Sequence, residues 1–264
     1  MSKRLFVVFA LFFVALTSPA LADSIASVVA VLGNPTSSGP GGNRTLAAGN
    51  PIFENDKITV TVGNAQILFT DGTKLVVGPS STLMINKYLM RGTSNTAQDF
   101  SIKALRGTFR FITGKSPKSA YKIQTANATI GIRGTAFDFW VQNVTGVALL
   151  KGKVRLCDNT KNKSSCVNLN PTCEVGTTEN ATAKKFKGEP QGRRLLNNLP
   201  FIVNQTGLTK GFRLNTDNCR AALAATQIPP RSSSDSDSFN RPPSDKTPPP
   251  PPPPPRRTGD QNYG

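Results

Sequence analysis

Few residues of this chain could do chemistry, and the commonest general base is missing. The sequence contains no histidine, which excludes serine–histidine and cysteine–histidine nucleophiles. Its 15 carboxylates are scattered without a paired motif. Asp138 lies between Phe137 and Phe139, so strand alternation would place it on the opposite face, in solvent or paired with a base such as Arg133. The sequence therefore predicts a protein that is not an enzyme.

The four cysteines are Cys157, Cys166, Cys173 and Cys219. An even number of cysteines predicts two disulfides in an exported chain, and three pairings are possible. The preferred pairing joins Cys157 to Cys166 around a short polar loop and Cys173 to Cys219. Zinc is disfavoured, because histidine and Cys-x-x-Cys pairs are both missing. No phosphate-binding glycine loop is present either, so we predict no metal and no cofactor.

The parity of the apolar residues changes within residues 129–141. Ile130 and Ile132 are even-numbered, whereas Phe137 and Phe139 are odd, so the strand inserts a residue or turns a corner between them. Gly134 tolerates the backbone angles of such a bulge. The same change occurs twice more: across Arg106-Gly107, Phe100 and Ile102 give way to Leu105, Phe109 and Phe111, and across Lys151-Gly152, Val147 and Leu149 give way to Val154 and Leu156. Because the pair of a basic residue and a glycine occurs at three such points, we interpret it as a structural feature of the fold and not as a catalytic site.

Arg133 and Thr135 have two interpretations at this point. Their side chains could hydrogen-bond backbone groups freed by the bulge, or they could form an edge that meets a ligand or partner. The repeat of the same residue types at Arg106-Gly107-Thr108 favours the structural interpretation.

Strand signals recur from Ile52 to Leu156, and Asp71-Gly72 is a strong two-residue turn signal. No long stretch keeps apolar residues at helical spacing, so the predicted core is all-β. The repeated corners favour a twisted, solenoid-like domain. A sandwich with bulged strands stays open as the alternative.

Residues 125–139, Thr-Ala-Asn-Ala-Thr-Ile-Gly-Ile-Arg-Gly-Thr-Ala-Phe-Asp-Phe, closely resemble the hallmark segment of the FecR domain. The motif residues are Ile132, Arg133, Gly134, Thr135 and Phe137. The order of the surrounding pieces is similar too: Gly49, Ile52 and Asp56, then residues 65–75, Leu105-Arg106-Gly107 and residues 147–154. The resemblance covers roughly residues 45–156 and implies a bacterial protein with a twisted β domain.

Family members of the regulatory type look like three-part proteins. They have a cytoplasmic domain that contacts a sigma factor, one membrane helix and a periplasmic FecR domain. Here a predicted leader occupies the place of the first two parts: Lys3 and Arg4, an apolar run over residues 5–16, and Ala20-Leu21-Ala22 before Asp23. The run is too short to span a bilayer, and no later segment matches its length. The resemblance therefore implies only the half that meets another protein or ligand.

The sequence divides into five predicted parts. They are a signal peptide (1–22), an N-terminal strand and flexible loop (23–44), a FecR-like β domain (45–156), a Cys-containing extension packed on it (157–228) and a disordered proline-rich tail (229–264).

The formal charge of +17 has two interpretations: the protein is simply basic, or its charge attracts anionic partners. Nucleic acid is disfavoured, because the phenylalanines that could stack bases alternate along strands as core residues do. We expect a periplasmic or secreted binding module that contacts another envelope protein in signalling or scaffolding. The alternative is a basic protein that binds an anionic polymer of the cell wall or outer membrane.

Overall fold

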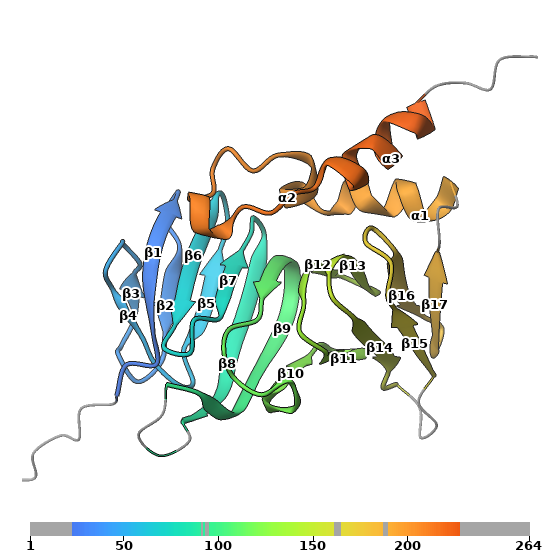
Figure 1. Ribbon diagram of the computed structural model, residues 1–264. Helices are drawn as coiled ribbons and strands as arrows, with labels where there is room; N and C mark the ends of the chain where they lie inside the picture. The colour runs from blue at the N-terminus through green and yellow to red at the C-terminus, as the bar shows by residue number, and fades with distance from the viewer. Residues whose placement is uncertain (1–22, 91, 93–94, 161–164, 187–189, 228–264) are drawn as a thin grey trace, which may run out of the picture. The chain divides into compact units, whose positions relative to one another are not determined.

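The computed structural model describes residues 23–227 except 91, 93–94, 161–164 and 187–189. These residues form two facing β-sheets and a layer of short helices over one of them (Figure 1). The predicted signal peptide and the proline-rich tail lie outside the described residues. None of the helices in the described part of the chain has the length and apolar character needed to span a bilayer.

The upper sheet in Figure 1, here called sheet A, has its strands in the following spatial order. They are β4 (Pro51–Ile52), β1 (Ala26–Leu32), β6 (Asn64–Phe69), β7 (Lys74–Val77), the second part of β9 (Ala97–Ile112), β12 (Ala136–Val141), β13 (Thr145–Lys151), β16 (Val175–Glu179) and β17 (Thr182–Phe186).

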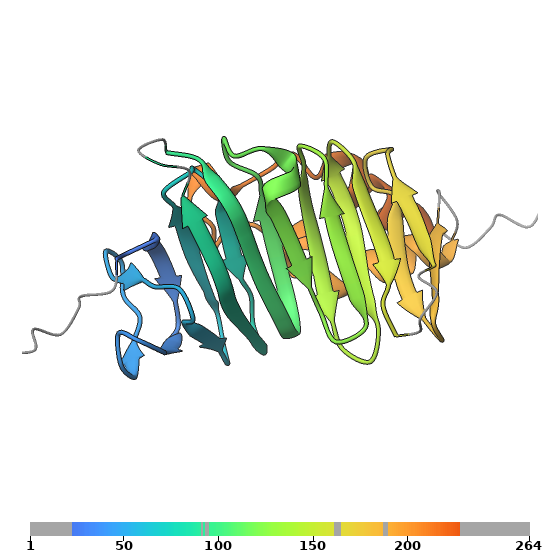
Figure 2. The ribbon, with the colours of Figure 1, turned by 90° about the horizontal axis from the view of Figure 1, so that it is seen from below.

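The lower sheet, sheet B, faces the viewer in Figure 2. Its strands are β3 (Arg44–Thr45), β2 (Thr36–Ser38), β5 (Lys57–Val60), β8 (Ser81–Met90), the first part of β9, β10 (Tyr121–Gln124), β11 (Ala128–Ile132), β14 (Val154–Asp158) and β15 (Cys166–Leu169). Among these pairings, β9 with β10 is parallel and the others are antiparallel.

The main core lies between the two sheets and takes buried apolar residues from both. Aromatic rings connect the layers: Phe100 on sheet B lies with its ring centroid 4.6 Å from that of Phe69 on sheet A. On sheet A, Phe109 and Phe139 stack at 4.8 Å, and Phe137 and Phe111 lie at 5.7 Å. The all-β prediction is confirmed, and the architecture is sandwich-like. The described strands close into neither a barrel nor a solenoid.

Each predicted corner is a crossing from one sheet to the other. β9 leaves sheet B and joins sheet A at Gly107, where φ is 104°. Gly134 separates β11 in sheet B from β12 in sheet A, and Gly152 separates β13 in sheet A from β14 in sheet B, with φ of 67° and 86°. Inner-face positions change parity because the chain changes sheets. Leu105 was expected inside but is exposed, since it precedes the crossing and points out of sheet B.

The glycine crossings before and after β9 lie at opposite ends of the strands, here called the two rims of the sandwich. Gly33, Gly63 and Gly107 lie on one rim: Gly33 follows the end of β1, Gly63 precedes the start of β6, and Gly107 is where β9 enters sheet A. Gly134 and Gly152 lie on the other rim, beside the end of β9 at Ile112. β9 therefore joins two oppositely oriented halves.

The segment after residue 156 packs on the preceding strands and first adds three strands of its own. β15, β16 and β17 continue both sheets to Phe186, because β15 pairs with β14 and β16 pairs with β13. Short helices follow: α1 (Pro190–Leu195), η2 (Leu196–Asn198), α2 (Pro200–Val203), η3 (Lys210–Phe212) and α3 (Asp217–Gln227). A further one, η1 (Lys118–Ala120), precedes β10.

The helical layer, residues 190–227, covers the outer face of sheet A (Figure 1). Trp140, Ala148 and Leu150 on that face pack against Leu199 and Ile202 of the layer. The Cys173–Cys219 disulfide joins α3 to the loop before β16, and Cys157–Cys166 joins β14 to β15. Both match the pairing preferred from the sequence. Sheet A is thus covered on both faces, whereas the outer face of sheet B is open.

Candidate functional site

Asp138, the carboxylate singled out by its sequence setting, is committed to structure. Its two oxygens accept hydrogen bonds from Nε and Nη2 of Arg110, at 2.7 and 2.8 Å, and neither side chain is exposed. The guanidinium also donates to the carbonyl of Phe201 at 2.9 Å and to the side chain of Gln205, both in the helical layer. Burial raises the pKa of Asp138, and the charge and hydrogen bonds of Arg110 oppose that rise. The partner is Arg110 rather than Arg133, because Asp138 lies opposite Arg110 in the ladder of β9 and β12.

A second buried carboxylate, Asp71, holds the turn between β6 and β7. It accepts hydrogen bonds from the hydroxyls of Thr73, Ser116 and Tyr121, at 2.9, 2.6 and 2.8 Å. Its backbone N–H donates to the Tyr88 hydroxyl at 2.9 Å. Burial raises the pKa of both tyrosines, and the nearby Asp71 charge adds to the rise. This network connects the β6–β7 turn of sheet A to Tyr88 on β8 and Tyr121 on β10 of sheet B, so its role is structural.

The five motif residues divide between core, corner and surface. Ile132 and Phe137 are buried in the main core. Thr135 is buried at the corner, where its hydroxyl donates to the carbonyl of Lys151. Gly134 supplies the positive φ. Arg133 differs from the others: it is exposed, and its side chain makes no hydrogen bond or ion pair with another described residue.

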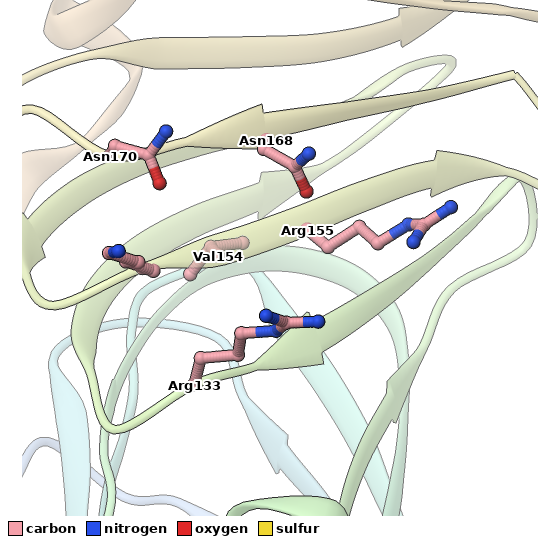
Figure 3. A pocket seen from close by; sticks show the side chains of 6 residues that line it. Arg133, Val154, Arg155, Asn168 and Asn170 are labelled. Atoms are coloured by element: carbon pink, nitrogen blue, oxygen red, sulfur yellow. The ribbon is translucent and has the colours of Figure 1, made fainter.

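Arg133 belongs to a cluster on the open face of sheet B. The register of β11, β14 and β15 places one row of outward residues side by side, and the residues of a second row lie directly beyond the ends of these three strands. We call this set the basic grid: Gly131, Arg155 and Asn168 in one row, and Arg133, Lys153 and Asn170 in the other. Figure 3 shows Asn168 on β15 and Asn170 just beyond it, with Arg155 on the neighbouring strand β14 and Arg133 next to that strand. The hollow among them has a volume of about 190 Å³.

The positive charges of the basic grid have no carboxylate partners among the described residues. Arg133, Lys153 and Arg155 are all exposed, and within the described residues no carboxylate oxygen lies within 4.0 Å of their nitrogens. Lys122 on β10 adds a fourth cation, opposite Gly131. Exposed cations in such a group attract anions at a range set by the ionic strength.

The backbone under the basic grid is rigid. Cys157 and Cys166 are directly opposite each other on β14 and β15, and their disulfide lies one outward position away from Arg155 and Asn168. The N–H of Arg133 also donates to the carbonyl of Lys153 at 3.1 Å, which carries the ladder across to β11. Fixed strands hold the cations at set spacings, so the grid is preorganised for anions.

Of the grid residues, Arg133 alone was a candidate from the sequence motif. The others escaped notice because their grouping depends on the register of β11, β14 and β15. One signal was available: Lys153 and Arg155 alternate with the buried Val154 and Leu156, which is typical of a strand with one face in water.

The grid lies partly inside a segment that matches a known family: Asn168 and Asn170 fall beyond the end of the match. Residues 56–155 match the FecR protein family. Two crystal structures of a candidate anti-sigma factor from Parabacteroides distasonis ATCC 8503, at 2.50 and 1.65 Å resolution, are similar over 50% of this chain, with 20% identity and a TM-score of 0.37. The match spans 59% of that chain, less than two thirds of its length. Among curated proteins, none matches this chain in sequence. Residues 56–155 of this chain are therefore similar to the FecR domain.

Proposed function

We propose that this chain is a non-enzymatic protein of the bacterial cell envelope whose FecR domain binds another envelope protein in signalling or scaffolding. The observation that carries the proposal is the basic grid, a set of exposed cations on a rigid sheet face without carboxylate partners among the described residues. Such a surface binds by charge and shape. The non-enzymatic part is supported by Asp71 and Asp138, because hydrogen bonds within the fold occupy their carboxylates.

The proposal includes export of the chain from the cytoplasm. The sequence of residues 1–22 has the features of a cleavable leader, and two disulfides fit an oxidising compartment. Fractionation of the producing bacterium should recover a chain that begins at Asp23 in the periplasm or medium. Recovery of the uncleaved chain from the cytoplasm would contradict this part of the proposal.

Site-specific crosslinking in intact cells tests the contact itself. A photoreactive amino acid at Asn168, inside the grid, should give a discrete crosslinked protein band that mass spectrometry identifies. The same amino acid at Thr182, an exposed position on β17 of sheet A, is the matched control. Equal crosslinking from both positions, or none from either, would contradict a partner protein at the grid.

Binding to an anionic polymer of the wall or outer membrane is the second candidate. It is favoured by the spread of positive charge on sheet B beyond the grid, which includes the exposed Lys57 and Lys103. Retention on peptidoglycan or lipopolysaccharide should then fall steeply from low to high salt, because salt screens such contacts. Retention that is insensitive to salt would rule out this candidate.

A further inference from the structure

The basic grid has a spacing that can be compared with that of a ligand. Lys153 directly precedes β14 and Arg155 is the second residue of that strand. In extended backbone their side chains start about 7 Å apart. Arg133 lies beside Lys153 on the next strand, about 5 Å away. Asn168 on β15 and Asn170, directly after that strand, repeat this spacing of two residues. The grid thus presents polar groups at the repeat of an extended polypeptide.

The types of side chain narrow the ligand further. An arginine guanidinium offers a planar fork of N–H donors that matches a carboxylate or a phosphate. The amides of Asn168 and Asn170 both donate and accept hydrogen bonds, as peptide groups do. No aromatic side chain lines the hollow, so it has no platform on which a base could stack.

Gly131 keeps the grid accessible between two cations. It lies in register between Lys122 on β10 and Arg155 on β14. A Cβ atom there would meet Arg155 at 3.7 Å, an ordinary contact, so packing does not require glycine. Its φ does not require glycine either, because it is not among the positive values. The missing side chain leaves a space in the row, between cations that lie about 10 Å apart.

We infer that the basic grid binds an acidic polypeptide segment in extended conformation, with carboxylates at alternate residues. Successive side chains on one face of such a segment lie about 7 Å apart, which matches Lys153 and Arg155. Asn168 and Asn170 would bond its peptide groups. This inference rests on the proposed function and specifies the chemistry of the partner. A membrane surface fits less well, because it recognises the amount of positive charge and not its spacing.

Two labelled peptides test the spacing. One repeats Glu-Ser and the other repeats Glu-Ser-Ser, with the same number of glutamates. In extended conformation the first has every carboxylate on one face, and the second alternates them between faces. By fluorescence anisotropy with the full mature chain, the Glu-Ser peptide should bind about ten-fold more tightly. Equal affinities would overturn the inference.

Three variants locate the binding. Arg133→Gln with Arg155→Gln should weaken binding of the Glu-Ser peptide by about ten-fold or more, since two charge-assisted contacts are lost. Gly131→Glu should weaken it similarly, by placing a carboxylate in the row. The control, Lys57→Gln with Lys184→Gln, removes the same charge from exposed positions outside the grid and should change affinity less than about two-fold. Equal losses in the grid and control variants would overturn the inference.

Competition separates the sources of negative charge. Polygalacturonate, polyphosphate and vesicles containing phosphatidylglycerol should displace the Glu-Ser peptide less well than the unlabelled peptide does. Stronger displacement by a polymer or vesicle would overturn the inference in favour of that ligand. If the Asn168 crosslink forms but persists in the Arg133→Gln, Arg155→Gln variant, the proposed protein contact stands and the acidic-segment inference fails. Unchanged thermal unfolding shows that the variants are folded.

Discussion

Arg110 and Asp138 face each other across β9 and β12, and their two-pronged ion pair has no exposed surface. The pair lies where sheet A meets the helical layer, and Arg110 also donates to the carbonyl of Phe201. An aspartate inside the segment that matches the FecR family is thereby tied to a residue outside that segment.

Removing one member of this pair should cost far more than removing both. Arg110→Met or Asp138→Leu alone leaves a buried charge without its partner, which should lower the free energy of unfolding by about 3–5 kcal/mol. The double variant Arg110→Met, Asp138→Leu removes both charges and should recover most of that loss. Urea denaturation measures the three values. Single variants within about 1 kcal/mol of the parent would contradict the buried-pair account.

The corner glycines should differ in their tolerance of alanine. At Gly152 a Cβ atom would lie 2.1 Å from the carbonyl oxygen of Gly134, a backbone atom with no room to move. At Gly134 the nearest atom is Cε of Lys118, at 3.2 Å, on a flexible side chain. Gly134→Ala should therefore cost about 1–2 kcal/mol, from its positive φ alone. Gly152→Ala should lower the melting temperature distinctly more. Equal shifts in calorimetry would show that the crossings do not pack as described.

Tyr88 and Tyr121 should make stability depend on alkaline pH. Because their pKa values are raised in the folded chain, the folded state holds these protons more tightly than the unfolded state. Their contribution to stability is fully present below the ordinary tyrosine pKa of about 10 and is lost as pH rises through the folded values.

Absorbance titration of phenolate provides the measurement. The third tyrosine, Tyr263, is replaced by phenylalanine so that only the buried pair is seen. Phenolate absorbance should then appear together with loss of β circular dichroism, well above pH 10. A phenolate signal near pH 10 in a chain that remains folded would show that the Asp71 network is open to solvent.

The two disulfides should contribute unequally to stability. Cys173–Cys219 spans 46 residues and Cys157–Cys166 spans 9. From loop length alone, replacing the cysteines by serine should cost about 4 kcal/mol for the first and about 3 kcal/mol for the second.

The single tryptophan, Trp140, distinguishes their positions. It is buried beneath the helical layer, in the cluster that contains Cys219. Its fluorescence should shift to longer wavelength in the Cys173→Ser, Cys219→Ser variant, as water reaches the ring. The Cys157→Ser, Cys166→Ser variant should keep the parent spectrum below its unfolding transition. Identical spectra for both variants would contradict an attachment of the layer through Cys219.

Local pattern was enough to predict the all-β fold and the corners. Apolar parity located the crossings at Gly107, Gly134 and Gly152, because a change of sheet reverses which residues point inwards. The Asp71-Gly72 signal located the β6–β7 turn, where Gly72 has φ of 83°. In both cases a few neighbouring residues carry the information.

Relationships that depend on register could not be predicted in this way. Asp138 had Arg133 as its nearest basic residue in sequence, whereas pairing of β9 with β12 brings Arg110 opposite it. The helical layer over sheet A had one signal in the sequence. Val147, Ala148, Leu149 and Leu150 form an unbroken apolar run, as expected for a strand that is buried on both faces. The basic grid could not be predicted either, because its residues come together only when the register of β11, β14 and β15 is known.

The alternation of hairpins between the sheets makes the C-terminal half modular. β10–β11, β12–β13, β14–β15 and β16–β17 are successive hairpins that belong in turn to sheet B, sheet A, sheet B and sheet A. Each new hairpin lies on the exposed edge left by the one two steps before it. The sandwich can therefore grow or shorten by one hairpin at that end, while every earlier crossing keeps its place. This accounts physically for a fold that runs on to Phe186, although the family match ends at residue 155.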